Sequence, residues 1–155
     1  IEERYAPQNI ASLVPLDSGL RAEMWRLFEW VTGKFSDEVS RYVLDEKIGK
    51  RELKTGAPDP SALRAAKANL AEHLQYFDYL LATRRWLAGY EMTLADFALA
   101  AHLSALDYLG DIDWNSAAET KDWFARIKSR PSFRPLLGDR VSAMPASASY
   151  ADLDF

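Results

Sequence analysis

At 155 residues, with 48% hydrophobic content and many aromatic side chains, the chain can bury the core of one ordinary domain and is not expected to be disordered. Its net charge of −4 gives no electrostatic reason to expect a nucleic acid as partner, and no stretch predicts membrane insertion. The absence of cysteine excludes disulfides and thiolate nucleophiles, and it suits a cytoplasmic protein, as we expect this one to be.

The first 17 residues read as the end of a helix followed by a linker. Residues 1–7 end at a proline, and the residue before a proline disfavours helical geometry. Residues 8–17 show no periodicity and form the expected linker. Because the chain opens at Ile1 in what looks like the middle of a helix, we expect it to be a fragment of a longer protein.

A long helix is expected from residue 18, with Asp17 or Ser18 as its N-cap. Apolar residues then recur every three or four positions and predict a core-facing stripe, made of Leu20, Met24, Leu27, Phe28, Val31 and Phe35. A second face carries Trp25, Glu29 and Thr32. A tryptophan off the main stripe indicates either packing against a neighbouring helix or contact with another molecule.

Two further segments continue the helical pattern. Residues 45–54 (DEKIGKRELK) carry charges of both signs, which predicts a solvated helix end rather than a ligand site. After a break at residues 56–58, Asp59 as N-cap and Pro60 as first helical residue predict a new helix whose apolar stripe runs to Leu81.

The stretch Thr93–Gly110 (TLADFALAAHLSALDYLG) predicts a central buried helix, because it is apolar on nearly every face. Thr93 and Asp96 are spaced as a capping box. Met92 and Phe97 are spaced as a hydrophobic staple, and Gly110 suits the left-handed residue after a helix end.

The last third of the chain predicts two shorter helices, over residues 116–129 and 131–137, followed by a coil tail over residues 139–155. No alternation of period two is long enough to predict a strand. The fold class is therefore all-α, a helical bundle around the central buried helix, and residues 18–138 form its domain.

The sequence contains few candidate catalytic residues. His73 and His102 stand alone in the sequence, without the spacing of a metal site or a catalytic motif. We expect His102 to be a core histidine hydrogen-bonded to a neighbour, and His73 to be half exposed on its helix. The capping role accounts for Asp96 without a catalytic one. No metal site and no catalytic residue are predicted in this chain.

The C-terminal residues YADLDF alternate apolar and acidic side chains. A solvated chain end is one interpretation. The other is a segment that docks into a groove of a partner, with the candidate residues Tyr150, Asp152, Leu153, Asp154 and Phe155.

The order of elements resembles the all-helical C-terminal domain of cytosolic glutathione transferases. The most specific match is Met92-Thr93-Leu94-Ala95-Asp96, which resembles the capping box and staple of that superfamily. The opening IEERY is similar to the end of the last helix of the preceding thioredoxin-like domain, and residues 123–133 are similar to the penultimate helix.

A narrower resemblance rests on residues 34–47 (KFSDEVSRYVLDEK), 128–140 (KSRPSFRPLLGDR) and the final YADLDF. These look like a branch that includes the FtsZ-binding, transferase-like cell-division regulators of alphaproteobacteria. This branch implies a non-catalytic protein that binds FtsZ. The alternative is a glutathione transferase that conjugates glutathione to a hydrophobic electrophile.

In the superfamily, the residue that activates the glutathione thiol and most glutathione contacts lie in the thioredoxin-like domain. The resemblance therefore implies glutathione as a cofactor of the full-length protein only. It also implies a homodimer, and it places the first helix at the substrate cleft or the dimer interface. The candidates on that helix are Trp25, Phe28, Glu29 and Thr32.

Overall fold

The computed structural model describes residues 12–142, 144–153 and 155. Every regular element in these residues is helical, with two isolated β-bridges and no strand among them, so the predicted all-α class is confirmed. The predicted helix remnant at residues 1–7 lies outside the described residues. No helix of the described chain has the length and apolar character needed to cross a membrane.

The first part of the chain forms a continuous helical rod, which we define as Ser18–Glu52. It is built from α2 (Ser18–Glu29), η1 (Trp30–Ser40), α3 (Arg41–Leu44), η2 (Asp45–Gly49) and α4 (Lys50–Glu52). Asp17 caps it as predicted, because its Oδ1 accepts a hydrogen bond from the N–H of Leu20 at 2.8 Å. The elements η1 and η2 are π-helical, which the sequence pattern did not predict.

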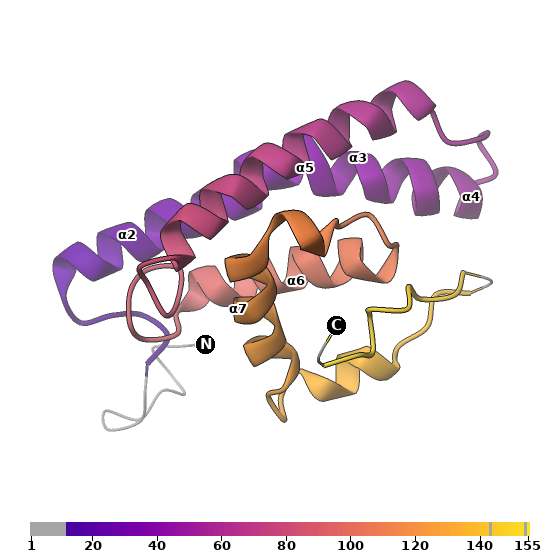
Figure 1. Ribbon diagram of the computed structural model, residues 1–155. Coiled ribbons are helices and arrows are strands. Elements are labelled where there is room, and N and C mark those ends of the chain that lie inside the picture. The colour runs from indigo at the N-terminus through magenta and orange to yellow at the C-terminus, as the bar shows by residue number, and fades with distance from the viewer. Residues whose placement is uncertain (1–11, 143, 154) are drawn as a thin grey trace.

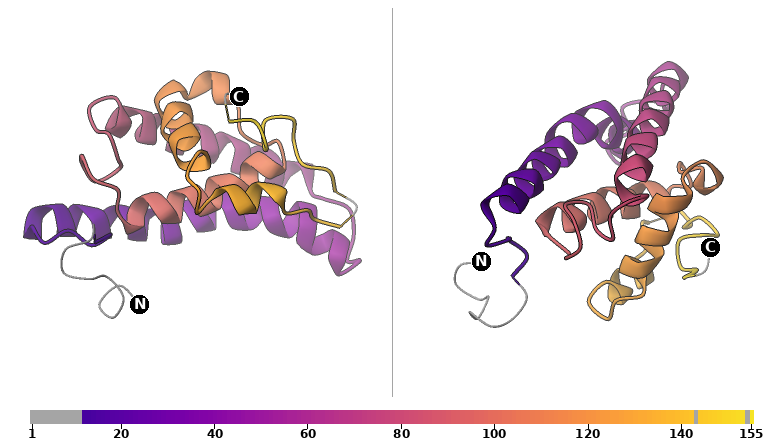
Figure 2. Two further views of the ribbon diagram at one scale, coloured as in Figure 1. Left: turned by 90° about the horizontal axis from the view of Figure 1, so that it is seen from below. Right: turned by 60° about the vertical axis from the view of Figure 1, so that its left-hand side comes forward.

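The helix α5 (Pro60–Leu81) runs back alongside the rod and forms a long hairpin with it (Figure 1). Its predicted start is confirmed, because Asp59 Oδ1 accepts from the N–H of Ser61 at 2.8 Å. The remaining elements lie on one side of this hairpin, as Figure 1 and the right-hand view of Figure 2 show. They are α6 (Leu94–Tyr108), η3 (Trp114–Ser116), α7 (Ala118–Lys128) and η4 (Arg134–Gly138).

The helix α6 packs against α2 and η1, while α7 packs against α5. The core lies between these layers. Its fully buried large side chains include Leu27, Phe35, Phe77, Leu99, Leu103, Leu106, Trp123 and Phe124. The prediction that α6 is apolar and central is therefore right for most of its length.

One side of α6 is nevertheless open. Phe97 is 41% exposed, and Ala101 is also exposed. The predicted burial on every side is wrong at these two residues, because no described element covers that side of the helix. Before α6, the carbonyl of Leu13 accepts from the N–H of Leu94 at 3.1 Å, so the linker is held at the start of α6.

Candidate functional site

The start of α6 is built around the buried carboxylate of Asp96, which is 0% exposed. The predicted capping box is present, and Asp96 Oδ2 accepts from the backbone N–H of Thr93 at 2.8 Å and from its hydroxyl at 3.0 Å. Oδ1 accepts from the N–H of Leu87 and from the indole N–H of Trp123, each at 2.9 Å. Burial raises the pKa of Asp96, and these four hydrogen bonds oppose the rise. With both oxygens engaged, the residue joins three segments rather than serving as a catalytic acid.

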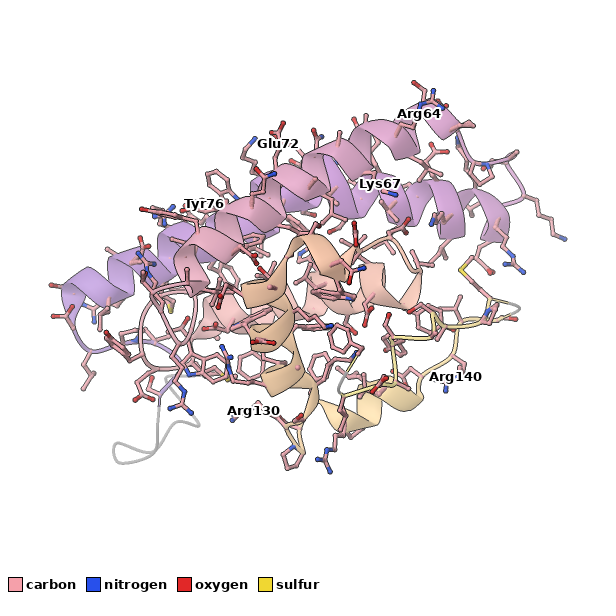
Figure 3. All side chains as sticks on the ribbon, in the orientation of Figure 1. Arg64, Lys67, Glu72, Tyr76, Arg130 and Arg140 are labelled. Atoms are coloured by element: carbon pink, nitrogen blue, oxygen red, sulfur yellow. The ribbon has the colours of Figure 1, made fainter. Side chains whose placement is uncertain are left out.

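The staple residues Met92 and Phe97 line one apolar hollow of about 140 Å³. Leu136 and Arg130 lie on its other side. Arg130 projects away from the bundle (Figure 3). The hollow is the open side of α6 described above, so it is a surface that another part of the protein or a partner could cover.

The helix face singled out in the sequence carries an aromatic pair, in which Trp25 is exposed and Phe28 is partly buried against the core. The rings of Trp25 and Phe28 meet edge to face, with centroids 5.5 Å apart, and Trp25 is 43% exposed. Glu29 and Thr32 are exposed beside them, and the Thr32 hydroxyl donates to the carbonyl of Phe28 at 2.9 Å. The structure thus gathers the four candidates on one open helix face.

His73 is 4% exposed, so the prediction of a half-exposed side chain is wrong. Trp30 donates its indole N–H to His73 Nδ1 at 3.1 Å, and this leaves the proton on Nε2, which lies 3.0 Å from Glu38 Oε2. Burial lowers the pKa of His73, while Glu38 opposes that shift. Both ring nitrogens are therefore occupied in a structural hydrogen-bond chain.

His102 is half-buried, and its Nδ1 lies 2.9 Å from the hydroxyl of Ser40. This confirms the predicted core histidine. Burial lowers the pKa of His102 as well. Within the described residues, no group of three or more histidine or acidic side chains is placed to hold a metal ion.

The C-terminal tail lies against the bundle instead of extending into solvent. Tyr150 is 4% exposed, its ring packs edge to face on Tyr108 with centroids 4.9 Å apart, and its hydroxyl donates to the carbonyl of Leu136 at 2.9 Å. Phe155 packs against Trp114, with centroids 4.9 Å apart.

The remaining tail candidates differ in how far they are covered. Leu153 is partly buried, whereas Asp152 is exposed. Asp154 lies outside the described residues.

A buried cation holds this tail in place. Lys128 is 0% exposed, and its Nζ donates to the carbonyl of Ser149 at 2.7 Å and to Asp107 Oδ2 at 3.2 Å. The same Nζ lies 3.8 Å from the ring centroid of Phe155. Burial lowers the pKa of Lys128, and Asp107 opposes that shift. Sequence reasoning missed Lys128, although it follows the inward-facing Phe124 by four residues and so shares its helix face.

The domain is all-α: the capped, buried helix α6 packs against the long hairpin of the rod and α5, and α7 packs on the other layer. This arrangement is that of the helical domain of glutathione transferases. The family model for the glutathione S-transferase C-terminal domain matches residues 39–131. The chain belongs to this family.

Individual members of the family are similar to this chain over most of its length. FtsZ-localized protein A of Caulobacter vibrioides is 50% identical over 143 residues, which are 92% of this chain and 63% of that protein. The structure of FzlA from C. crescentus superposes with a TM-score of 0.93 at 47% identity, over 99% of this chain and 68% of that one. A glutathione S-transferase from Rhodospirillum rubrum gives the same TM-score at 44% identity, over 99% and 68% of the two chains. The chain thus spans less than two thirds of the length of FtsZ-localized protein A.

Proposed function

We propose that this chain is the helical domain of a non-catalytic, cytoplasmic regulator of bacterial cell division that binds FtsZ. The observation that carries the proposal is the 50% identity to FtsZ-localized protein A across 92% of this chain. Asp96 and His73 are each held by structural hydrogen bonds on both of their polar atoms, so these two side chains serve the fold.

The tail is the candidate contact segment. Tyr150 and Phe155 anchor it to the bundle, and Asp152 between them is exposed. An ordered segment with an exposed carboxylate loses little conformational entropy on binding, which favours a specific contact. In this proposal the tail presents Asp152 to the FtsZ filament from a fixed position.

Co-sedimentation with polymerised FtsZ tests the proposal in the full-length protein. Ending the chain at Ala151 keeps the Tyr150 anchor and removes the acidic tip together with Phe155. We expect this variant to bind FtsZ at least tenfold more weakly. Its melting temperature should fall, because the packing of Phe155 on Trp114 is lost, while its helical content stays that of wild type. The control replaces two exposed carboxylates elsewhere, as Asp122→Asn and Asp139→Asn, and should bind as wild type. Unchanged binding of the truncated protein would count against the tail as the contact.

We also propose that the full-length protein is a homodimer, and that the Trp25–Phe28 face is covered either by the partner subunit or by the rest of the chain. The exposed indole of Trp25, packed edge to face on Phe28, favours such a contact. Light scattering coupled to size exclusion should report a dimer. Trp25→Ser should shift it toward monomer if the partner covers this face, and should lower the melting temperature alone if the rest of the chain does.

A second candidate function is glutathione transfer to a hydrophobic electrophile. The likeness to the Rhodospirillum rubrum transferase favours it. In that case the thiol-activating group lies outside this chain, and Trp25, Phe28, Glu29 and Thr32 line the electrophile site. Calorimetric titration of the full-length protein with glutathione distinguishes the transferase from the FtsZ-binding regulator. Binding at millimolar concentration or tighter, together with conjugation of a generic electrophile, supports the transferase, and no detectable heat supports the regulator.

A further inference from the structure

A histidine ring closes the contact between η1 and α5. Trp30 on η1 donates its indole N–H to Nδ1 of His73 on α5 at 3.1 Å, and Nε2 of the same ring lies 3.0 Å from Glu38 Oε2. The ring also meets Phe35 of η1 edge to face, with centroids 5.1 Å apart. We call these four residues the η1 latch, because they hold the π-helical stretch to α5 near both of its ends.

The η1 latch can form only with a neutral imidazole. An indole nitrogen donates a hydrogen bond and does not accept one, so His73 Nδ1 accepts from Trp30 and the ring proton lies on Nε2. A second proton can bind only at Nδ1, where it would point at the indole hydrogen. Protonation of His73 and the bond from Trp30 therefore exclude each other.

The surroundings of His73 also make a charged ring costly. Its side chain is 4% exposed, and burial lowers its pKa below the usual 6.5. Glu38 opposes this shift, Lys34 adds to it, and Glu72 opposes it from α5. Glu38 compensates only in part, because it is 37% exposed and also pairs with Lys34.

A second histidine meets the same phenylalanine from α6. His102 packs edge to face on Phe35, with centroids 5.8 Å apart, and its Nδ1 lies 2.9 Å from the hydroxyl of Ser40. A hydroxyl both donates and accepts, so this bond can form with the imidazole neutral or protonated. His102 is thus a matched comparison for His73, in which the hydrogen bond does not exclude the proton.

We propose that His73 is a proton-operated latch, which holds η1 against α5 while its imidazole is neutral and releases Trp30 when the imidazole takes up a proton. A lowered histidine pKa means that the closed state favours the neutral form. The stabilisation is therefore present above pH 6.5 and is lost as pH falls below that value. The rod that carries the Trp25–Phe28 face is the part of the domain that responds.

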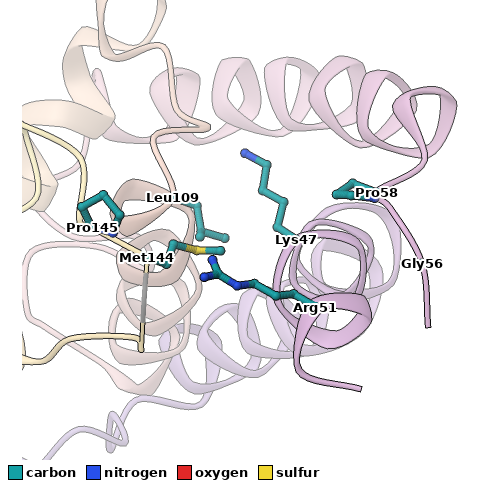
Figure 4. A pocket seen from close by; sticks show the side chains of 7 residues that line it. All are labelled: Lys47, Arg51, Gly56, Pro58, Leu109, Met144 and Pro145. Carbon is teal, nitrogen blue, oxygen red and sulfur yellow. The ribbon is translucent and has the colours of Figure 1, made fainter. Parts of the chain in front are cut away.

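The far end of the rod is attached by an ion pair instead, in which Lys47 Nζ lies 2.6 Å from Asp111 Oδ1. Figure 4 shows Lys47 and Arg51 leaving the rod there, at a cleft of about 540 Å³ that Leu109 and Met144 line on the opposite side. This contact does not depend on the protonation of an imidazole. A fall in pH through the histidine range thus releases the middle of the rod while its far end stays attached.

Nuclear magnetic resonance of the full-length protein, with nitrogen-15 in its tryptophans, tests the latch. Each indole N–H gives its own resonance, and that of Trp30 is assigned by its loss in Trp30→Phe. From about pH 8 to about pH 5 we expect this resonance to move, with a midpoint below 6.5, as the indole loses its acceptor. The indole of Trp114, which donates to Asp107 Oδ1, is the internal control and should keep its position.

Three variants assign the transition to His73. His73→Gln offers Trp30 an amide oxygen and cannot take up the proton, so its Trp30 resonance should not change with pH. Glu38→Gln changes a partly exposed residue and removes the anion that favours the protonated ring, so the midpoint should fall by roughly half a pH unit. His102→Gln is the control and should leave the transition in place.

Four results would overturn the inference. The first is a Trp30 resonance in wild type that stays fixed down to about pH 5. The second is a transition that persists in His73→Gln or disappears in His102→Gln. The third is a midpoint in Glu38→Gln that stays at its wild-type value or rises. The fourth is a simultaneous change of the Trp114 resonance, because it would show that the whole domain unfolds rather than the contact between η1 and α5.

Discussion

Trp123 donates its indole N–H to Asp96 Oδ1 at 2.9 Å, and this bond joins the middle of α7 to the first turn of α6. The two residues are both 0% exposed. Three other donors share the same carboxylate, so Asp96 fixes the loop before α6, the start of α6 and the position of α7 at once.

Asp96→Ala should therefore be strongly destabilising. It leaves four buried donors without an acceptor, and each unsatisfied buried group costs about 1–3 kcal/mol, with incomplete additivity. We expect a loss of about 3 kcal/mol or more in the free energy of unfolding, measured by urea denaturation. Asp17→Ala, which removes an exposed cap of α2, serves as the control and should cost about 1 kcal/mol. Equal losses in the two variants would contradict the joining role of Asp96.

Leu103 and Phe97 on α6 should differ in how much stability they lose on truncation to alanine. Leu103 is 0% exposed, so Leu103→Ala should cost roughly 2–5 kcal/mol. Phe97 is 41% exposed, so Phe97→Ala in this chain should cost less, about 2 kcal/mol, because only part of its surface leaves water on folding. Thermal unfolding of both variants measures the difference. A larger cost in the full-length protein would show that the hollow lined by Phe97 is covered there.

Stability should fall at acid pH through Glu23. Its carboxylate accepts from Arg26 at 2.7 and 2.8 Å and from Arg84 at 2.8 Å. The Arg26 bond, followed by the Arg84 bond, outweighs partial burial and lowers the pKa of Glu23 from 4.5 to about 2. A depressed pKa means that the folded state favours the ionised form, so the stabilisation is present above pH 4.5 and is lost as pH falls toward about 2.

Glu23→Gln measures this contribution. At pH 7 the variant should be less stable by about 1 kcal/mol, a figure that allows for solvent screening of a partly exposed group. The difference between variant and wild type should shrink between pH 4.5 and about 2. A difference that is constant over this range would rule out Glu23 as the source.

Lys128→Met should release the tail. It removes the bond to the Ser149 carbonyl and leaves Asp107 as a buried charge without its cation, which costs about 3 kcal/mol or more. Amide hydrogen exchange should rise in residues 147–153. Lys121→Met is a suitable control, because Lys121 Nζ also lies over Phe155, at 5.5 Å, but from a partly exposed position. Unchanged exchange in Lys128→Met would show that the aromatic contacts alone hold the tail.

The elements with strong local signals could be predicted from the sequence. The caps at Asp17 and Asp59 and the capping box at Thr93 are short-range hydrogen bonds, so the residues that make them lie within a few positions of one another. The bounds of α5 could also be predicted, because apolar residues recur every three or four positions along its buried face.

Long-range polar contacts could not be predicted. The burial of His73 depends on Trp30, 43 positions earlier, and the order of the tail depends on Lys128. Residues 45–54 are predicted to be a solvated helix end because they carry charges of both signs, and the helix does end at Glu52 with residues 51–54 exposed. The pairing of Lys47 with Asp111, 64 positions away, could not be predicted from that local pattern.

The π-helical stretch Trp30–Ser40 makes the two ends of the rod depend on each other. Within it the chain bonds five residues back, as in the bond from the N–H of Arg41 to the carbonyl of Ser36. Deletion of a single residue there would let the stretch relax to ordinary α geometry, and in an α-helix one residue corresponds to a rotation of about 100°. The residues after the deletion would then be rotated about the helix axis. Lys47 and Arg51 would face a different direction, while Met24 and Leu27 would keep their positions. Insertions and deletions in this segment are thus a means by which evolution could redirect one surface of the domain without rebuilding its interior.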